Sequence, residues 1–135
     1  MDERITKRLN RLIRIAFEEA QKGDHKQRIG CVLFDKKKIL SRGHNYCMKS
    51  SKKLHPRFQR YIGSVHAEVD AILSARKELK GSCMLVIRIN KKDQFRLSKP
   101  CASCLKYIQH VGIKKLFYSI SEYPYIEEID ISKKE

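Results

Sequence analysis

The first part of the chain alternates apolar and polar residues with the period of an α-helix. The apolar residues recur every three or four positions, so they share one face. Gly23 follows them and suits the end of a helix. The pattern therefore predicts an amphipathic helix over residues 3–22. Its apolar face consists of Ile5, Leu9, Leu12, Ile13, Ala16, Phe17 and Ala20.

Short apolar runs bounded by turn residues predict the strands. The runs IGCVLFD and KILSRGHN lie on either side of a lysine turn, which is typical of a β-hairpin. We expect a third strand at CMLVIRI, a fourth at KKLFYSIS and a candidate fifth at IEEIDIS. The segment NKKDQFRLSK, which follows the third strand, is interpreted as a polar extension.

Two further helices are predicted between these strands. The stretch SVHAEVDAI has apolar residues at helical spacing, and we expect its helix to run to about Leu79 and to end at Gly81. The stretch PCASCLKYIQHVG begins with Pro100, which suits the first turn of a helix, and finishes with Gly112, which suits its end. Residues 46–63 have no clean period and are interpreted as a long basic loop, with a short helix around 57–62 as an option.

The order of the elements predicts the fold class. Helices alternate with strands after an initial hairpin, which indicates a three-layer α/β/α domain with a mixed sheet of four to five strands. The turn SEYPY is too short for a crossover helix, so the last two strands are expected to be antiparallel. The length favours a single domain over residues 1–131, with 132–135 as a frayed tail.

Charge and composition narrow the partners. The chain has 30 basic and 15 acidic residues, which gives a formal net charge of +15. Such an excess favours polyanionic partners, although a lysine-rich coding bias would produce the same number. No apolar run is long enough to span a membrane, and the N-terminus lacks the pattern of a signal peptide. We therefore expect a cytosolic protein, or a nuclear one if the host has a nucleus.

Five cysteines are more typical of thiols or metal ligands than of disulfides in a reducing compartment. Cys101 and Cys104 form a C-x-x-C at the start of a predicted helix, where positions three apart share a face. The positive end of a helix dipole favours thiolates, which are zinc ligands. A redox pair is the alternative, but no thioredoxin-like pattern surrounds it. Cys31 is expected in the core, and Cys47 and Cys83 are assigned no role.

His66 and Glu68 lie in the first turn of the predicted helix, where a plain amphipathic helix has no need of them. A histidine would complete a site of three protein ligands, which leaves a fourth zinc position open for water, as catalytic zinc requires. Glu68 could then take a proton from that water and return it to a substrate. The sequence thus predicts a catalytic zinc site formed by His66, Cys101 and Cys104, with Glu68 as proton carrier.

The combination of H-A-E with P-C-x-x-C resembles the zinc nucleobase deaminases of the cytidine deaminase-like superfamily, over most of the chain. The resemblance implies zinc ligation by the histidine and both cysteines, proton transfer by Glu68, and a backbone N–H of Ala67 that helps to hold the base. It also implies that Asn45 contacts the substrate sugar, the alternative being a turn residue that ends a strand. Ser98 is a candidate near the base edge, with a helix N-cap as the slightly favoured alternative, and His44 is a candidate for the pocket.

The resemblance implies conversion of cytosine to uracil, and two substrates compete. The loop SKKLHPRFQRY mixes cations with aromatic residues, a mixture that binds phosphates and stacks bases, so single-stranded nucleic acid is slightly favoured. Its candidate contacts are Lys52, Lys53, Arg57, Phe58, Arg60 and Tyr61. The alternative interpretation of this loop is a solvated segment whose two aromatic side chains are anchored in the core.

The alternative functions are a free cytidylate or deoxycytidylate deaminase, an adenosine deaminase acting on RNA, and a non-catalytic zinc module, which Glu68 argues against. The oligomeric state is left open.

Overall fold

The computed structural model describes residues 3–22, 28–45, 66–75 and 78–131. The predicted loop at 46–63, with its six candidate nucleic-acid contacts, lies outside these residues. So do Cys47 and the predicted tail at 132–135. The single-domain assignment stays a prediction.

The described elements follow the predicted order with one addition. They are α1 (Glu3–Gln21), β1 (Arg28–Phe34), β2 (Ile39–His44), α2 (Ala67–Ala75), β3 (Cys83–Ile89), β4 (Phe95–Arg96), α3 (Ala102–His110), β5 (Lys115–Ser119) and β6 (Ile126–Asp130). The addition is β4, a two-residue strand inside the segment that was interpreted as a polar extension. Among the described residues, no helix has both the length and the apolar composition that a membrane span needs.

The strands form one mixed sheet in the order β2-β1-β3-β5-β6, with β4 paired to β3 off this path. β1 is antiparallel to both β2 and β3, and β3 is parallel to β5. β5 and β6 are antiparallel, which confirms the expectation from the short turn between them. The described sheet has six strands, so the predicted count of four to five was too low because β4 is too short to show a period in sequence.

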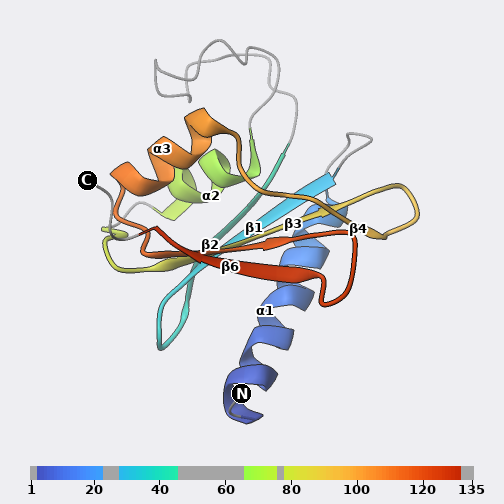
Figure 1. Cartoon of the computed structure of the whole chain (residues 1–135). Coiled ribbons are helices and arrows are strands. Elements are labelled where there is room, and N and C mark those ends of the chain that lie inside the picture. The colour runs from blue at the N-terminus through green and yellow to red at the C-terminus, as the bar shows by residue number, and fades with distance from the viewer. Residues whose placement is uncertain (1–2, 23–27, 46–65, 76–77, 132–135) are drawn as a thin grey trace.

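Helices cover both faces of the sheet, which confirms the three-layer architecture (Figure 1). α1 packs on one face through Leu12, Ala16 and Ala20. α2 and α3 lie together on the other face, and Ala71 and Ile108 belong to the core there. Successive residues of a strand point to opposite faces, so the central strands supply both cores. The α1 core takes Val32, Phe34, Leu85 and Ile87, and the opposite core takes Cys31, Leu33, Met84 and Val86.

Two glycines let the helices approach the sheet closely. A Cβ on Gly30 would lie 2.6 Å from the backbone nitrogen of Ala20 in α1. A Cβ on Gly43 would lie 2.5 Å from the backbone nitrogen of Ala71 and 2.8 Å from the carbonyl oxygen of Ala67 in α2. Neither position has room for a side chain. Gly43 therefore fixes how closely the first turn of α2, which follows His66, lies on β2.

The helix ends differ in part from the prediction. α2 is described to Ala75, and Leu79 is not helical, so the expected end at Leu79 is too late. The N–H and hydroxyl of Ser82 both donate to the Leu79 carbonyl, at 3.0 and 2.6 Å, and form a turn in place of a further helical turn. α3 ends as predicted, because Gly112 follows its last turn with a φ of 95°.

Candidate active site

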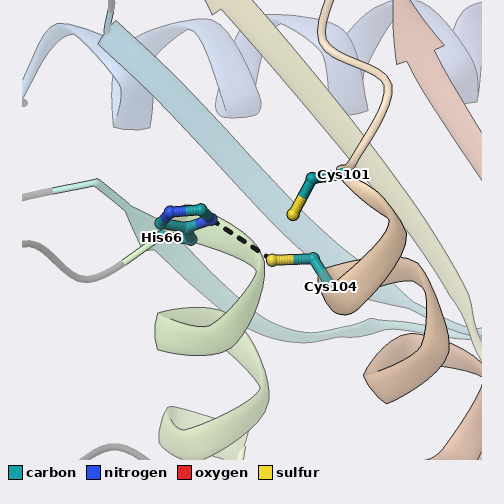
Figure 2. A group of neighbouring side chains, drawn as sticks. All are labelled: His66, Cys101 and Cys104. Carbon is teal, nitrogen blue, oxygen red and sulfur yellow. Dashed lines mark hydrogen bonds between the residues drawn. The ribbon is translucent and has the colours of Figure 1, made fainter. Parts of the chain in front are cut away.

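The two helices on one face of the sheet begin at the same place, and His66, Cys101 and Cys104 lie there (Figure 2). The carbonyl of His66 accepts a hydrogen bond from the Asp70 N–H at 2.9 Å, which opens α2. Cys101 is the N-cap of α3, and Cys104 follows in its first turn. The three side chains point toward one another, and we call them the ligand group. The fold thus brings together residues from two separated motifs.

The spacing of the ligand group fits a zinc ion. Nδ1 of His66 lies 3.2 Å from Sγ of Cys104, and the ligand atoms of all three residues lie within 4.8 Å of one another. Tetrahedral zinc with bonds of about 2.0 Å to nitrogen and about 2.3 Å to sulfur places neighbouring ligand atoms roughly 3.5–3.8 Å apart. The observed spacing brackets this range. Within the described ranges, no other set of three such residues gathers in this way.

The electrostatic surroundings suit ligands that must be deprotonated. Burial lowers the pKa of His66, so its imidazole is held neutral, which is the form that binds a metal. The N-termini of α2 and α3 both begin at the ligand group, and their dipoles favour thiolates there. Cys104 is buried, whereas Cys101 is exposed. The ligand group is therefore anchored in the core on one side and open to solvent on the other.

Glu68 is a buried carboxyl in the first turn of α2, only 5% exposed. Burial raises the pKa of Glu68 to about 7, and no cation of the described residues offsets that effect. A carboxyl with this pKa can both accept and release a proton near neutral pH. An amphipathic helix gains no stability from burying such a group. The buried position of Glu68 is therefore best explained by a role in proton transfer.

Asn45 and Ala67 lie next to the ends of the elements that lead to the ligand group. The Asn45 side-chain oxygen accepts a hydrogen bond from the Ile29 N–H at 2.8 Å, and the Asn45 N–H donates to the Ile29 carbonyl at 3.2 Å. Asn45 thus extends the pairing of β1 and β2, as expected for a residue that ends a strand. Ala67 is fully buried as the first residue of α2. Their contacts with a substrate stay predictions.

Ser98 is not a helix cap, so that interpretation was wrong. The N-cap of α3 is Cys101. The buried Ser98 hydroxyl donates to the Val86 carbonyl at 2.8 Å and accepts from the Ser119 N–H at 2.7 Å. It therefore ties the segment that leads to α3 to both β3 and β5. Its predicted role near a base edge stays a prediction.

His44 points toward the α1 layer, opposite to the layer that holds the ligand group. Its Nδ1 lies 2.8 Å from a carboxylate oxygen of Glu19, a buried residue of α1. Burial disfavours the charge of Glu19, but hydrogen bonds from His44 and Lys22 outweigh that effect and lower the pKa of Glu19. This direction of the imidazole does not support a role in the pocket, which stays an untested prediction.

Two residues that position the site were missed in the sequence. Oδ2 of Asp70 accepts a hydrogen bond from the His44 N–H at 3.1 Å and so ties the first turn of α2 to β2. The Ser119 hydroxyl donates to the Arg96 carbonyl at 2.6 Å, beside Ser98. An acidic residue in a first helical turn is a weak signal, because many helices have one there for their dipole. Nothing in the sequence singles out Ser119.

The fold has solved relatives that are deaminases. A dCMP deaminase from the cyanophage S-TIM5 superimposes with a TM-score of 0.64 and 20% identity, over 89% of this chain and 86% of that one. A cytidine deaminase from Burkholderia pseudomallei gives a TM-score of 0.60 and 17% identity, over 90% and 91% of the two chains. A Thermotoga maritima diaminohydroxyphosphoribosylaminopyrimidine deaminase/reductase gives a TM-score of 0.54 and 24% identity, over 83% of this chain and 29% of that one. At these identities the likeness shows the fold alone.

The sequence itself assigns the family. No curated protein matches the chain in sequence. The family model of the cytidine and deoxycytidylate deaminase zinc-binding region, in contrast, matches residues 6–120, which include His66, Glu68 and both cysteines of the ligand group. The chain therefore belongs to the cytidine and deoxycytidylate deaminase family and is a zinc-dependent hydrolytic deaminase.

Proposed function

We propose that this protein removes the amino group of cytosine by hydrolysis in a phosphate-bearing substrate. Glu68 is the residue that transfers the protons. The observation that supports this most is a carboxyl buried in the same helical turn that follows His66 of the ligand group. A structural zinc site has no use for such a group. The family match supports cytosine as the base.

The reaction consumes one water molecule, breaks the bond between C4 of cytosine and its amino nitrogen, and yields uracil and ammonia. His66, Cys101 and Cys104 would hold the zinc ion, whose Lewis acidity lowers the pKa of water. Glu68 accepts one proton from the attacking water and delivers it to the ring nitrogen, and it then carries the second proton of that water to the departing amine.

The order of substrate candidates differs from the sequence-based preference. A free nucleotide such as deoxycytidylate comes first, because the solved relatives include a dCMP deaminase that was crystallised in complex with dCMP and dUMP. Single-stranded nucleic acid comes second. It is supported by the net charge of +15, and the loop that favoured it in sequence lies outside the described residues.

The first prediction tests the role of Glu68. Glu68→Gln keeps the size of the side chain and removes its ability to carry protons, so turnover of deoxycytidylate should fall by about 10²–10⁴-fold. Because Glu68 is not a proposed ligand, elemental analysis should still show about one zinc per chain. Glu78→Gln, an exposed carboxyl elsewhere, is the matched control and should keep wild-type turnover. Wild-type rates in Glu68→Gln would contradict the mechanism.

A further inference from the structure

A basic pocket lies at the end of the sheet opposite to the ligand group. It has a volume of about 450 Å³, and four of its lining side chains are cations: Arg8, Lys36, Lys37 and Lys114. Among the described residues that line it, Asp35 is the one acid. We call this concavity the basic pocket. Its cations contribute to the net charge of +15, and the chemistry at the zinc site does not require them.

The connectivity places the basic pocket far from the zinc site. The ligand group lies at the N-terminal ends of α2 and α3, whereas Lys114 and Gly81 of the basic pocket lie beyond the C-terminal ends of these helices. The Gly81 N–H donates to the Gly112 carbonyl at 2.8 Å, so the segments that follow the two helices meet at this end of the sheet. α3 has nine residues and spans about 13 Å, so its length separates the two sites.

The cations of the basic pocket are presented by a fixed framework. The Arg8 guanidinium donates to the Asp35 carbonyl and lies 5.5 Å from the centre of the Phe34 ring. Oδ1 of Asp35 accepts from the N–H groups of Lys37 and Lys38, each at 2.8 Å, and these bonds lower the pKa of Asp35. The acid of the pocket is thus engaged in holding the turn between β1 and β2. The backbone that carries Lys36 and Lys37 is therefore held in place beside Arg8.

The lysines of the basic pocket have no carboxylate partner in the described part of the chain. The ion pairs there involve Lys22, Arg28, His44 and Lys115, and none involves Lys36, Lys37 or Lys114. Lys36 and Lys37 are exposed, and Lys114 is half-buried. Three ammonium groups around one concavity repel one another, and an anionic ligand would relieve that repulsion.

The positive surface continues from the basic pocket along α1. Lys7, Arg11 and Arg14 are exposed and share one face of the helix, next to Arg8. We call these three residues the basic face of α1. It spans about 10 Å, which exceeds the reach of a single phosphate. The apolar face of α1 is packed on the sheet, so the helix has no free apolar face to insert into a lipid surface.

We propose that the basic pocket and the basic face of α1 bind the phosphodiester backbone of a single-stranded polynucleotide, at a distance from the zinc site. The linear arrangement of cations fits a chain of phosphates, whereas an isolated nucleotide could occupy only the pocket. Binding here requires neither zinc nor cytosine. The inference therefore goes beyond the proposed function and stands whether deoxycytidylate or a polymer is deaminated.

The test uses an oligonucleotide that the zinc site cannot process. Binding of a fluorescent oligothymidylate, which lacks cytosine, is measured by anisotropy over a salt series. Lys36→Ala/Lys37→Ala should weaken binding several-fold and make the log–log salt slope shallower by about 1.4, since each lost contact contributes roughly 0.7. Lys91→Ala/Lys92→Ala is the matched control, because these two lysines are also adjacent and exposed in a turn, between β3 and β4. The control should bind like the wild type.

Each outcome decides the proposal. Equal losses in the two double variants would mean diffuse attraction by net charge and would overturn it, as would absence of binding at low salt. Competition by inorganic pyrophosphate at concentrations that match those of the oligonucleotide phosphates would identify a site for free phosphates instead. Binding of anionic lipid vesicles in preference to the oligonucleotide would assign the surface to a membrane. Lys114→Gln, a milder single change, should show a smaller loss in the same direction.

Failure of this proposal can be told apart from failure of the proposed function. All lysine variants keep the ligand group and Glu68, so zinc content and any deoxycytidylate turnover report that they are folded. Glu68→Gln should bind oligothymidylate like the wild type. Loss of oligothymidylate binding in Glu68→Gln would contradict a site that is separate from the zinc.

Discussion

Single residues set how closely the layers approach at the active site. Gly43 has no side chain between β2 and α2, and the backbone of Ala67 and Ala71 occupies that space. Asp70 then joins the two elements through the His44 N–H. Because His66 and Glu68 belong to the start of α2, these contacts also fix the residues that are expected to do the chemistry.

The second prediction is that Gly43→Ala shifts the start of α2 away from the sheet. Its Cβ would lie 2.5–2.9 Å from atoms of Ala71, Ala67 and Asp70, two of which are backbone atoms. Overpacking of this kind costs about 1–3 kcal/mol of unfolding free energy. Turnover should also decrease, because the helix start moves. Denaturant unfolding and a deamination assay measure both effects.

The exposed residue Arg42, on the same strand, provides the control for Gly43→Ala. Arg42→Ala should change the unfolding free energy by less than about 0.5 kcal/mol. If Gly43→Ala were as stable and active as Arg42→Ala, the close packing of α2 on β2 would have no functional meaning.

At the scale of elements, two helices supply one ligand group. His66 comes from the start of α2, and both cysteines come from the start of α3. The side chain of Cys101, the N-cap residue of α3, makes no capping hydrogen bond. The segment before it is instead held to β3 and β5 by Ser98. A zinc ion would connect the two helix ends, so metal binding and stability should be coupled.

The third prediction is that removal of zinc lowers the thermal stability. A ligand at 1,000 times its dissociation constant stabilises the folded state by about 4 kcal/mol, and a chelator removes that contribution. Cys101→Ala should lose the metal and melt near the temperature of the chelated wild type. Cys101 suits this test because it is exposed, so its replacement costs little packing. Differential scanning calorimetry with elemental analysis measures both quantities.

Cys83, a thiol outside the ligand group, serves as the control for the zinc test. Cys83→Ala should keep about one zinc per chain and a chelator-sensitive melting temperature. Full zinc content in Cys101→Ala, or a wild type that melts identically with and without a chelator, would rule out the ligand group as proposed.

At the scale of the whole molecule, the positive charge is spread beyond the active site. The 30 basic residues include a group at the basic pocket, at the opposite end of the sheet from the zinc ligands. Charge of this extent raises the encounter rate with anions and makes binding depend on salt. The salt dependence of turnover therefore distinguishes the two substrate candidates.

The fourth prediction concerns that salt dependence. A panel of deoxycytidine, its monophosphate and triphosphate, single-stranded DNA and RNA is scored for uracil over a salt series. Turnover of deoxycytidylate should depend weakly on salt, because few phosphates are bound. The Michaelis constant of a polymer substrate should rise steeply, with a log–log slope of about 0.7 per phosphate contact.

Two results would change the assignment of the substrate. If only DNA or RNA is deaminated, the second candidate replaces the first. Joint neutralisation of Lys52, Lys53, Arg57 and Arg60 tests the loop prediction from the sequence, and it should then impair the polymer far more than deoxycytidylate. An inactive protein on the whole panel that nevertheless contains zinc would contradict cytosine deamination.

The sequence by itself determined the elements and the chemistry that depend on local patterns. The helical period of residues 3–22 and the alternation of strand residues reflect which faces must be buried. That pattern can be recognised from residues that are close together in the sequence. The zinc motif was recognisable because His66, Cys101 and Cys104 belong to short segments whose residue types are rare together. Glu68 was suggested by the same segment, since a plain amphipathic helix does not require it.

Only the tertiary structure decided what depends on partners far away in the chain. β4 exists because β3 offers an edge to two residues that have no period of their own. Ser98 became a bridge between strands, and His44 turned toward Glu19, because long-range neighbours satisfied their hydrogen bonds. Burial raises the pKa of Glu68 to about 7, and that burial comes from layers of the fold that are not adjacent in the sequence. The basic pocket likewise forms only when Arg8 of α1 meets the end of β1 and the start of β3, since hydrogen bonds, burial and charge act through space.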